Sequence, residues 1–195
     1  LTFGGVVASI VFGVAFGNVI LGVPFAVELD TMRPLYHGSF FGLFTPFALL
    51  CGVLSLFMHV THGATLLAWR VVDPVAERAR KLGMLTALIV AIIFALGGFW
   101  VATLDGHVIT SAIDPAGPSN PLTKTVELVS GAWLHNFQQW PWMWFAPALG
   151  VLGALLVSLL LALRRPTLAF FASSSSIAGI ILTVGFALFP FVLPS

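Results

Sequence analysis

Residues 44–72 read FTPFALLCGVLSLFMHVTHGATLLAWRVV, a long run that is apolar almost throughout. Thr45 is a typical helix N-cap, and Pro46 suits the first helical position, where its missing N–H costs no hydrogen bond. The roughly 27 residues from Pro46 onward would reach about 40 Å at about 1.5 Å per residue, more than the ~30 Å hydrocarbon layer of a bilayer. The run therefore predicts a membrane-spanning helix with one end protruding.

The composition of the whole chain agrees with a membrane protein. Of its 195 residues, 59% are hydrophobic and 8% are charged, which excludes a soluble domain with a polar surface. The net charge of +1 is too small to favour nucleic acid as a partner, and the single cysteine, Cys51, excludes an internal disulfide. We therefore expect a chain that is embedded in membrane lipid and binds no nucleic acid.

Four further apolar runs bring the expected number of spans to five. They cover residues 1–21, 82–104, 142–163 and 167–189, and polar or turn-rich segments separate them. Asp73, followed by Pro74, is expected to cap the helix of the third span, and Glu77 and Lys81 to form an i, i+4 ion pair. The pattern predicts an all-α membrane protein, with a single integral membrane domain over residues 1–195 and a bundle of about five transmembrane helices.

Small and hydroxyl residues recur inside two of these spans. In the first span they fall every fourth position, which predicts a groove for close packing against another helix: Gly5, Ser9, Gly13 and Gly17. The last span holds four consecutive serines, residues 173–176. Because serine in a membrane helix usually bonds the carbonyl one turn back, we expect a packing role rather than a polar pathway.

The loop between the third and fourth spans, residues 105–141, is too long to be a simple connector. From Thr123 onward the apolar residues Val126, Val129, Trp133 and Phe137 fall on one stripe at helical spacing. The stripe predicts a short amphipathic helix at the membrane surface. Four tryptophans near the start of the fourth span are expected to form an aromatic belt: Trp133, Trp140, Trp142 and Trp144.

The charged residues divide between the two sides of the five-span arrangement. One side carries Arg70, Arg78, Arg80, Lys81, Arg164 and Arg165, and the other carries Arg33 and Lys124. By the positive-inside rule the first side is cytoplasmic, so the long loop is periplasmic. Most of the carboxylates then also face the periplasm: Glu28, Asp30, Asp105, Asp114 and Glu127.

His59 and His62 are the ionisable side chains, apart from Cys51, that lie well inside a span. Their i, i+3 spacing predicts that both imidazoles face the same side of the helix. Three roles are open: a structural hydrogen bond to a neighbouring helix, a station on a proton route, or haem ligation. Two histidines three positions apart cannot take opposite faces of one porphyrin, so haem ligation is the least favoured and the structural role the most. No nucleotide loop, metal-ligand cluster or catalytic triad appears in the sequence, so catalytic and metal-binding residues are not expected.

A series of short runs, in order along the chain, carries a resemblance to a known family. The runs include GVAFGN (13–18), GVPF (22–25), SNPL (119–122), GAWL (131–134), PALG (147–150), ILT (181–183), FPF (189–191) and PS (194–195). Together with the long loop between the third and fourth spans, they resemble subunit II of the bacterial cytochrome bd ubiquinol oxidases. The resemblance covers essentially the whole chain.

The resemblance implies a multi-pass subunit of a quinol-oxidising, oxygen-reducing terminal oxidase in the bacterial inner membrane, an oxidoreductase of the respiratory chain. Subunit II would be the scaffold and part of the proton supply, with membrane lipids around it. Quinol would be the substrate of the complex, and a bound quinone is compatible with the family. Haem b and haem d would be carried by the partner, subunit I, and His59 and His62 match no haem ligand of the family.

The family's subunit has about eight spans, so this chain would be its middle and later part, without the first spans and the last. The functional acidic, arginine and tryptophan residues of the family would lie in the missing N-terminal part, and no catalytic or cofactor-binding residue is carried over. Two alternatives stay open: a secondary transporter and a stand-alone di-haem membrane cytochrome. The lack of an internal repeat weighs against the first, and the lack of histidines on facing helices weighs against the second.

Overall fold

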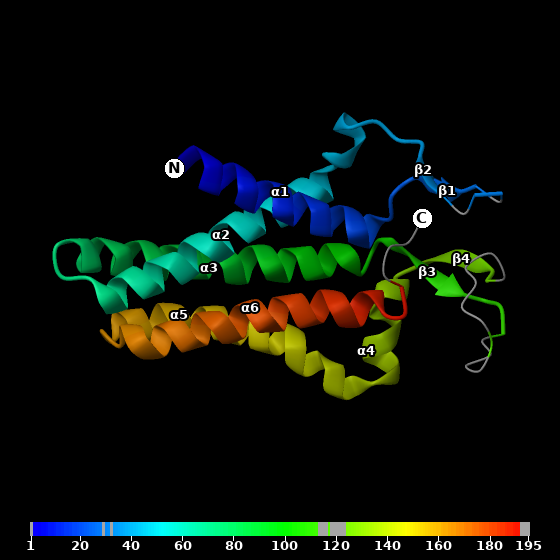
Figure 1. The fold of residues 1–195 in the computed structure, drawn as a ribbon. Helices are drawn as coiled ribbons and strands as arrows, with labels where there is room; N and C mark the ends of the chain where they lie inside the picture. Colours follow the sequence, from blue (N-terminus) through cyan, green and yellow to red (C-terminus); the bar gives the residue numbers. More distant parts are fainter. Residues whose placement is uncertain (1, 29, 32, 113–116, 118–123, 192–195) are drawn as a thin grey trace.

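The structure is a computed structural model that describes all residues except 1, 29, 32, 113–116, 118–123 and 192–195. Five helices in the described part are long and apolar enough to cross a membrane, and they lie side by side as a bundle (Figure 1). They are α1 (Thr2–Leu21), α2 (Pro46–Arg70), α3 (Val75–Val101), α5 (Phe145–Ala162) and α6 (Pro166–Leu188). The prediction of an all-α membrane protein with five spans is confirmed. Two runs quoted above, 119–122 and 194–195, lie outside the described residues.

The starts of α2 and α3 differ in how well the sequence predicted them. Thr45 caps α2 as expected, because its hydroxyl accepts a hydrogen bond of 3.2 Å from the backbone N–H of Ala48. Pro74, not Asp73, is the N-cap of α3, and no side chain bonds the first turn. The predicted Asp73 cap is therefore wrong, since the helix begins one residue too late for that carboxylate to reach its free N–H groups.

The first turns of α3 hold the ion pair that the sequence predicted, with an additional partner. Glu77 lies 3.7 Å from the ammonium of Lys81, but its shorter contact, 2.7 Å, is with Arg80. The Arg80 guanidinium also donates to the carbonyl of Leu161 at 3.1 Å, in the last turns of α5. Arg80 therefore satisfies a carbonyl at the end of one helix while it is fixed by a carboxylate on its own.

Two small antiparallel sheets lie together at one end of the bundle (Figure 1). In the first, β1 (Phe25–Val27) pairs with β2 (Pro34–Tyr36). In the second, β3 (Asp105–Ile109) pairs with β4 (Val126–Ser130), so that Gly106 faces Val129. Short helical turns follow β4 and lead into α5: η3 (Ala132–Leu134), α4 (His135–Gln139) and η4 (Pro141–Trp144).

The predicted amphipathic helix of the long loop is wrong in its first half. Val126 and Val129 lie in strand β4, and only Trp133 and Phe137 lie in helical turns. The β-branched valines suit an extended strand, and pairing with β3 satisfies their backbone groups. Gly131 then reverses the chain with a left-handed φ of 72°, which a residue with a side chain rarely adopts.

Trp133 is a core residue and not part of an aromatic belt. Its side chain is 1% exposed and packs with Ile20, Phe47 and Leu188 from the ends of three helices. Gly106 lies close against it, because a Cβ added there would be 3.0 Å from the indole ring. Burial of this indole attaches the loop to the bundle. The other three tryptophans are about half exposed, as a belt position predicts: Trp140, Trp142 and Trp144.

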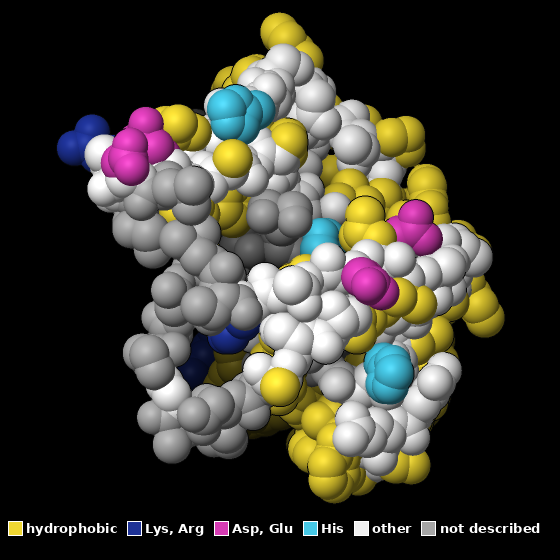
Figure 2. Space-filling view, turned by 90° about the vertical axis from the view of Figure 1, so that its right-hand side faces the viewer, with side chains coloured by type: hydrophobic (Ala, Val, Ile, Leu, Met, Phe, Trp, Pro, Cys, Tyr) yellow, Lys and Arg dark blue, Asp and Glu magenta, His cyan; other side chains and the backbone are white. Residues whose placement is uncertain are grey.

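The two ends of the bundle carry different charges. The turns that join α2 to α3 and α5 to α6 lie at the end opposite to the sheets (Figure 1). Six of the eight basic residues lie in or near these turns, and Arg33 and Lys124 lie at the sheet end: Arg70, Arg78, Arg80, Lys81, Arg164 and Arg165. Figure 2 shows the sheet end, where the exposed carboxylates lie: Glu28, Asp30, Asp105 and Glu127. Asp114 lies outside the described residues. The division agrees with the predicted split, and the assignment of the basic end to the cytoplasm stays a prediction.

Two of the four small residues predicted to form a groove on α1 lie in close contact with α2. A Cβ added at Gly13 would lie 2.6 Å from Cβ of Ser55, and one at Gly17 would lie 2.6 Å from Cα of Ala48. A Cβ at Gly5 would meet nothing within 4 Å. The packing prediction is thus confirmed for Gly13 and Gly17 against α2, and α1 leans away from the bundle toward its N-terminal end (Figure 1).

Replacing Gly13 by alanine tests this contact. We expect Gly13→Ala to destabilise the full-length protein by about 1–3 kcal/mol, because the new methyl group forces α1 away from α2. Gly97→Ala is the matched control, because it also adds one methyl to a membrane helix but meets only Leu50, at 3.9 Å. Thermal unfolding in detergent measures both. Equal losses from the two variants would contradict the close contact between α1 and α2.

Candidate functional site

His62 points from α2 toward α6 and is partly buried where the two helices meet. Its Nδ1 lies 2.8 Å from the hydroxyl oxygen of Ser173, 111 residues further along the chain. The imidazole ring also lies against Phe170, with 4.7 Å between the ring centroids. Ser173 itself is 3% exposed. The histidine is therefore held by one hydrogen bond and one aromatic contact, both from the same helix.

The direction of this hydrogen bond follows from counting protons. The Ser173 hydroxyl has one proton, which it donates to the carbonyl oxygen of Phe170 at 2.8 Å. The contact with His62 then requires that Nδ1–H donates and Ser173 accepts. Thr65 donates to the backbone carbonyl of His62 at 2.7 Å, which also places its own hydroxyl 3.3 Å from Ser173.

His59 occupies a different environment, although it is one turn away. It is exposed on the surface of the described bundle, and its Nδ1 donates to the backbone carbonyl of Ser55 at 2.7 Å. Residues at i and i+3 are offset by about 60° around a helix axis, enough to leave one inside and the other outside. The expectation that both imidazoles face one side is therefore met only in part, because only His62 turns toward α6.

Other hydroxyl groups in the interior also bond across helices. Thr61 of α2 donates to Thr86 of α3 at 2.8 Å, and Ser176 of α6 donates to the carbonyl of Gly150 in α5 at 2.7 Å. Ser174 and Ser175 bond the carbonyls one turn back, at 3.1 Å and 3.0 Å. The packing role predicted for the four serines is confirmed, and Ser173 and Ser176 form hydrogen bonds with a neighbouring helix.

The sequence did not identify Ser173 as the partner of His62. Two signals pointed toward it: the serine run itself, and the polar positions Thr61, His62 and Thr65 at helical spacing on α2. Neither signal says which helices are neighbours. Every span is mostly apolar, so the sequence of one span does not identify the span that it packs against.

The described residues do not fit a haem. His59 and His62 lie one turn apart on the same helix and turn in different directions, His62 toward Ser173 of α6 and His59 to the surface. They therefore cannot supply the two axial nitrogens of one porphyrin. In the described ranges, no three side chains of histidine, cysteine, aspartate or glutamate gather to hold a metal ion.

A large cavity lies between α2, α3, α5 and α6, near the sheet end of the bundle. Its volume is about 480 Å³, and the turns around Phe137 and Trp144 contribute to its wall. The lining is apolar apart from Thr183 and Cys51 and includes Leu50, Leu54, Phe94, Val151 and Val184. Such a lining suits an apolar molecule or chain and offers no acid or base for a reaction.

Comparison with known proteins places this bundle in a family. The family model for cytochrome bd terminal oxidase subunit II matches residues 1–195. The chain belongs to this family. Membership in a terminal oxidase family, together with five membrane-spanning helices, makes it a multi-pass inner-membrane protein.

Two named relatives show how far the similarity extends. The chain is 46% identical over 193 residues to cytochrome bd-I ubiquinol oxidase subunit 2 of Escherichia coli, which is 98% of this chain and 51% of that protein. It is 45% identical over 192 residues to the probable cytochrome oxidase subunit 2 of Haemophilus influenzae, which is 98% of this chain and 50% of the relative. The chain thus spans about half the length of the curated relatives that it matches.

Proposed function

We propose that the protein to which this chain belongs is the second subunit of a ubiquinol oxidase, which passes electrons from ubiquinol to oxygen and forms water. One observation carries the proposal: the match to the family runs from residue 1 to residue 195, and a relative of 46% identity is named as such a subunit. The bundle described above would be a single integral membrane domain of that subunit. Its activity would contribute to the proton gradient across the inner membrane.

Within this complex we propose that the chain serves as a scaffold and helps to supply protons, and that haem b and haem d are held by the larger partner, subunit I. The unsuitable geometry of His59 and His62 for a shared porphyrin supports a haem site elsewhere. When bound in the partner, the haems would supply the electron transfer and the oxygen chemistry. The residues of this chain would hold the helices in place beside them.

The apolar cavity supports a place for a quinone within this portion of the subunit. A chain of isoprene units is apolar, and the lining around Leu54, Phe94 and Val184 would bury it. Membrane lipids would cover the outer surface, where many large apolar side chains are exposed, among them Phe12, Leu85, Ile92, Leu152 and Leu159.

The proposed complex can be tested by purification of the full-length subunit. With a tag on this subunit, we expect a larger haem-containing chain to co-purify in detergent, and the pair to consume oxygen when ubiquinol is supplied. An absorption spectrum reports the haems, and an oxygen electrode reports the activity. Active protein that consists of this subunit alone, or a pair that contains no haem, would contradict the proposal.

For the two histidines we propose the structural role, with the proton route as the alternative. In the full-length subunit, His62→Phe removes the donor from α2 that the buried Ser173 oxygen accepts, which costs about 1–3 kcal/mol. We expect less assembled complex, with oxygen consumption per haem unchanged. His59→Phe is the matched control, because it removes only a bond to its own helix. We expect it to leave the yield near that of the unmodified protein.

The yield of complex and its oxygen consumption per haem also distinguish the proton route from the structural role. If His59 or His62 carries protons, replacement by phenylalanine slows oxygen consumption while the haem content per complex stays normal. Yield and turnover therefore report the two roles separately.

A further inference from the structure

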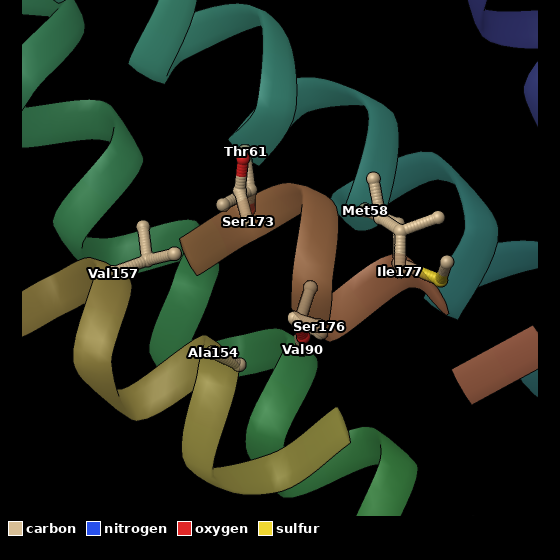
Figure 3. A pocket seen from close by; sticks show the side chains of 8 residues that line it. All are labelled: Met58, Thr61, Val90, Ala154, Val157, Ser173, Ser176 and Ile177. Carbon is tan, nitrogen blue, oxygen red and sulfur yellow. The ribbon is translucent and has the colours of Figure 1, made fainter. Parts of the chain in front are cut away.

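A second, much smaller space lies deeper in the bundle, where α2, α3, α5 and α6 meet (Figure 3). Its volume is about 10 Å³, close to the space that a single water molecule needs. Five apolar side chains form most of its wall: Met58, Val90, Ala154, Val157 and Ile177. Three hydroxyl residues complete it, namely Thr61, Ser173 and Ser176.

The three hydroxyl groups are all buried, and each has capacity to accept a hydrogen bond. Each is at least 96% buried, with exposed fractions of 4% for Thr61, 3% for Ser173 and 4% for Ser176. Each donates its one proton away from the space: Thr61 to Thr86, Ser173 to the Phe170 carbonyl and Ser176 to the Gly150 carbonyl. Thr61 and Ser176 can therefore still accept hydrogen bonds at the space. Ser173 already accepts one from His62 and can accept one more, and a water molecule brings two protons to donate.

We infer that this space binds one structural water molecule, which donates hydrogen bonds to hydroxyl oxygens of α2 and α6. A bound water molecule requires two to four polar partners in a space of about its own size, and the three hydroxyls meet that condition. A dry space would leave three buried oxygens with unused acceptor capacity in an interior of low dielectric constant. The space is too small for a lipid chain or a quinone ring.

The water would join two separate hydrogen-bonded groups into one network. On one side is the pair Thr61 and Thr86, and on the other is Ser173 with His62. In the described residues the donors end at backbone carbonyls, for example that of Leu82, which accepts from Thr86 at 3.0 Å. The inference rests on the size of the space and on its three hydroxyl groups, so it stands independently of the proposed oxidase role.

A density map of the full-length protein, in whatever assembly it purifies with, tests the inference directly. At a resolution of about 2 Å, we expect a spherical peak about 2.7–3.2 Å from at least two of the three hydroxyl oxygens. Other enclosed water molecules in the same map are the control, because they show that the map can resolve an ordered water. An empty space in a map that shows those waters would overturn the inference.

A filling variant gives a second, independent readout. Val90→Ile adds a methyl group at the wall of the space and displaces the water. We expect the peak to vanish and the midpoint of thermal unfolding to fall by about 2–4 °C, because the hydroxyl oxygens lose their donor. Val151→Ile, which adds the same group toward the large apolar cavity, should leave the midpoint unchanged or raised. A rise for Val90→Ile would mean that the space was dry and would overturn the inference.

Discussion

Polar side chains inside a membrane bundle have no bulk water to bond, so each needs a partner on its own helix or on a neighbouring one. The hydrogen bond between His62 and Ser173 is the clearest case, because it joins α2 and α6 across the interior. The hydrogen bond from Thr61 to Thr86 joins α2 to α3, and the one from Ser176 to the Gly150 carbonyl joins α6 to α5. These contacts relate four of the five spans to one another.

The hydrogen bond between α5 and α6 forms because small residues bring these two helix backbones together. A Cβ added at Gly179 would lie 2.5 Å from the backbone nitrogen of Gly150, and one at Gly153 would lie 3.0 Å from Ser176. Only at this separation can the Ser176 hydroxyl reach a main-chain carbonyl of α5. Lipid tails compete equally for apolar surface, so close packing and these hydrogen bonds provide the preference of one helix for another.

Features set by a single segment could be predicted from the sequence. The length of an apolar run fixes a span, and Thr45 with Pro46 fixes where α2 begins. Features set by a distant segment could not. Val126 and Val129 have helical spacing, but pairing with β3 makes them a strand, and the partner of His62 lies 111 residues away. Four tryptophans were predicted to form a belt, yet one of them, Trp133, is buried at the end of the bundle.

The claim that interior polar groups satisfy one another across helices is tested most directly by a double-mutant cycle between His62 and Ser173. The full-length protein is compared as His62→Phe, Ser173→Ala and the double variant, with the free energy of unfolding as the measure. Because the two side chains share one bond, the loss in the double variant should be smaller than the sum of the single losses by about 0.5–3 kcal/mol. Additive losses would contradict the account, since they would mean that the two residues act independently.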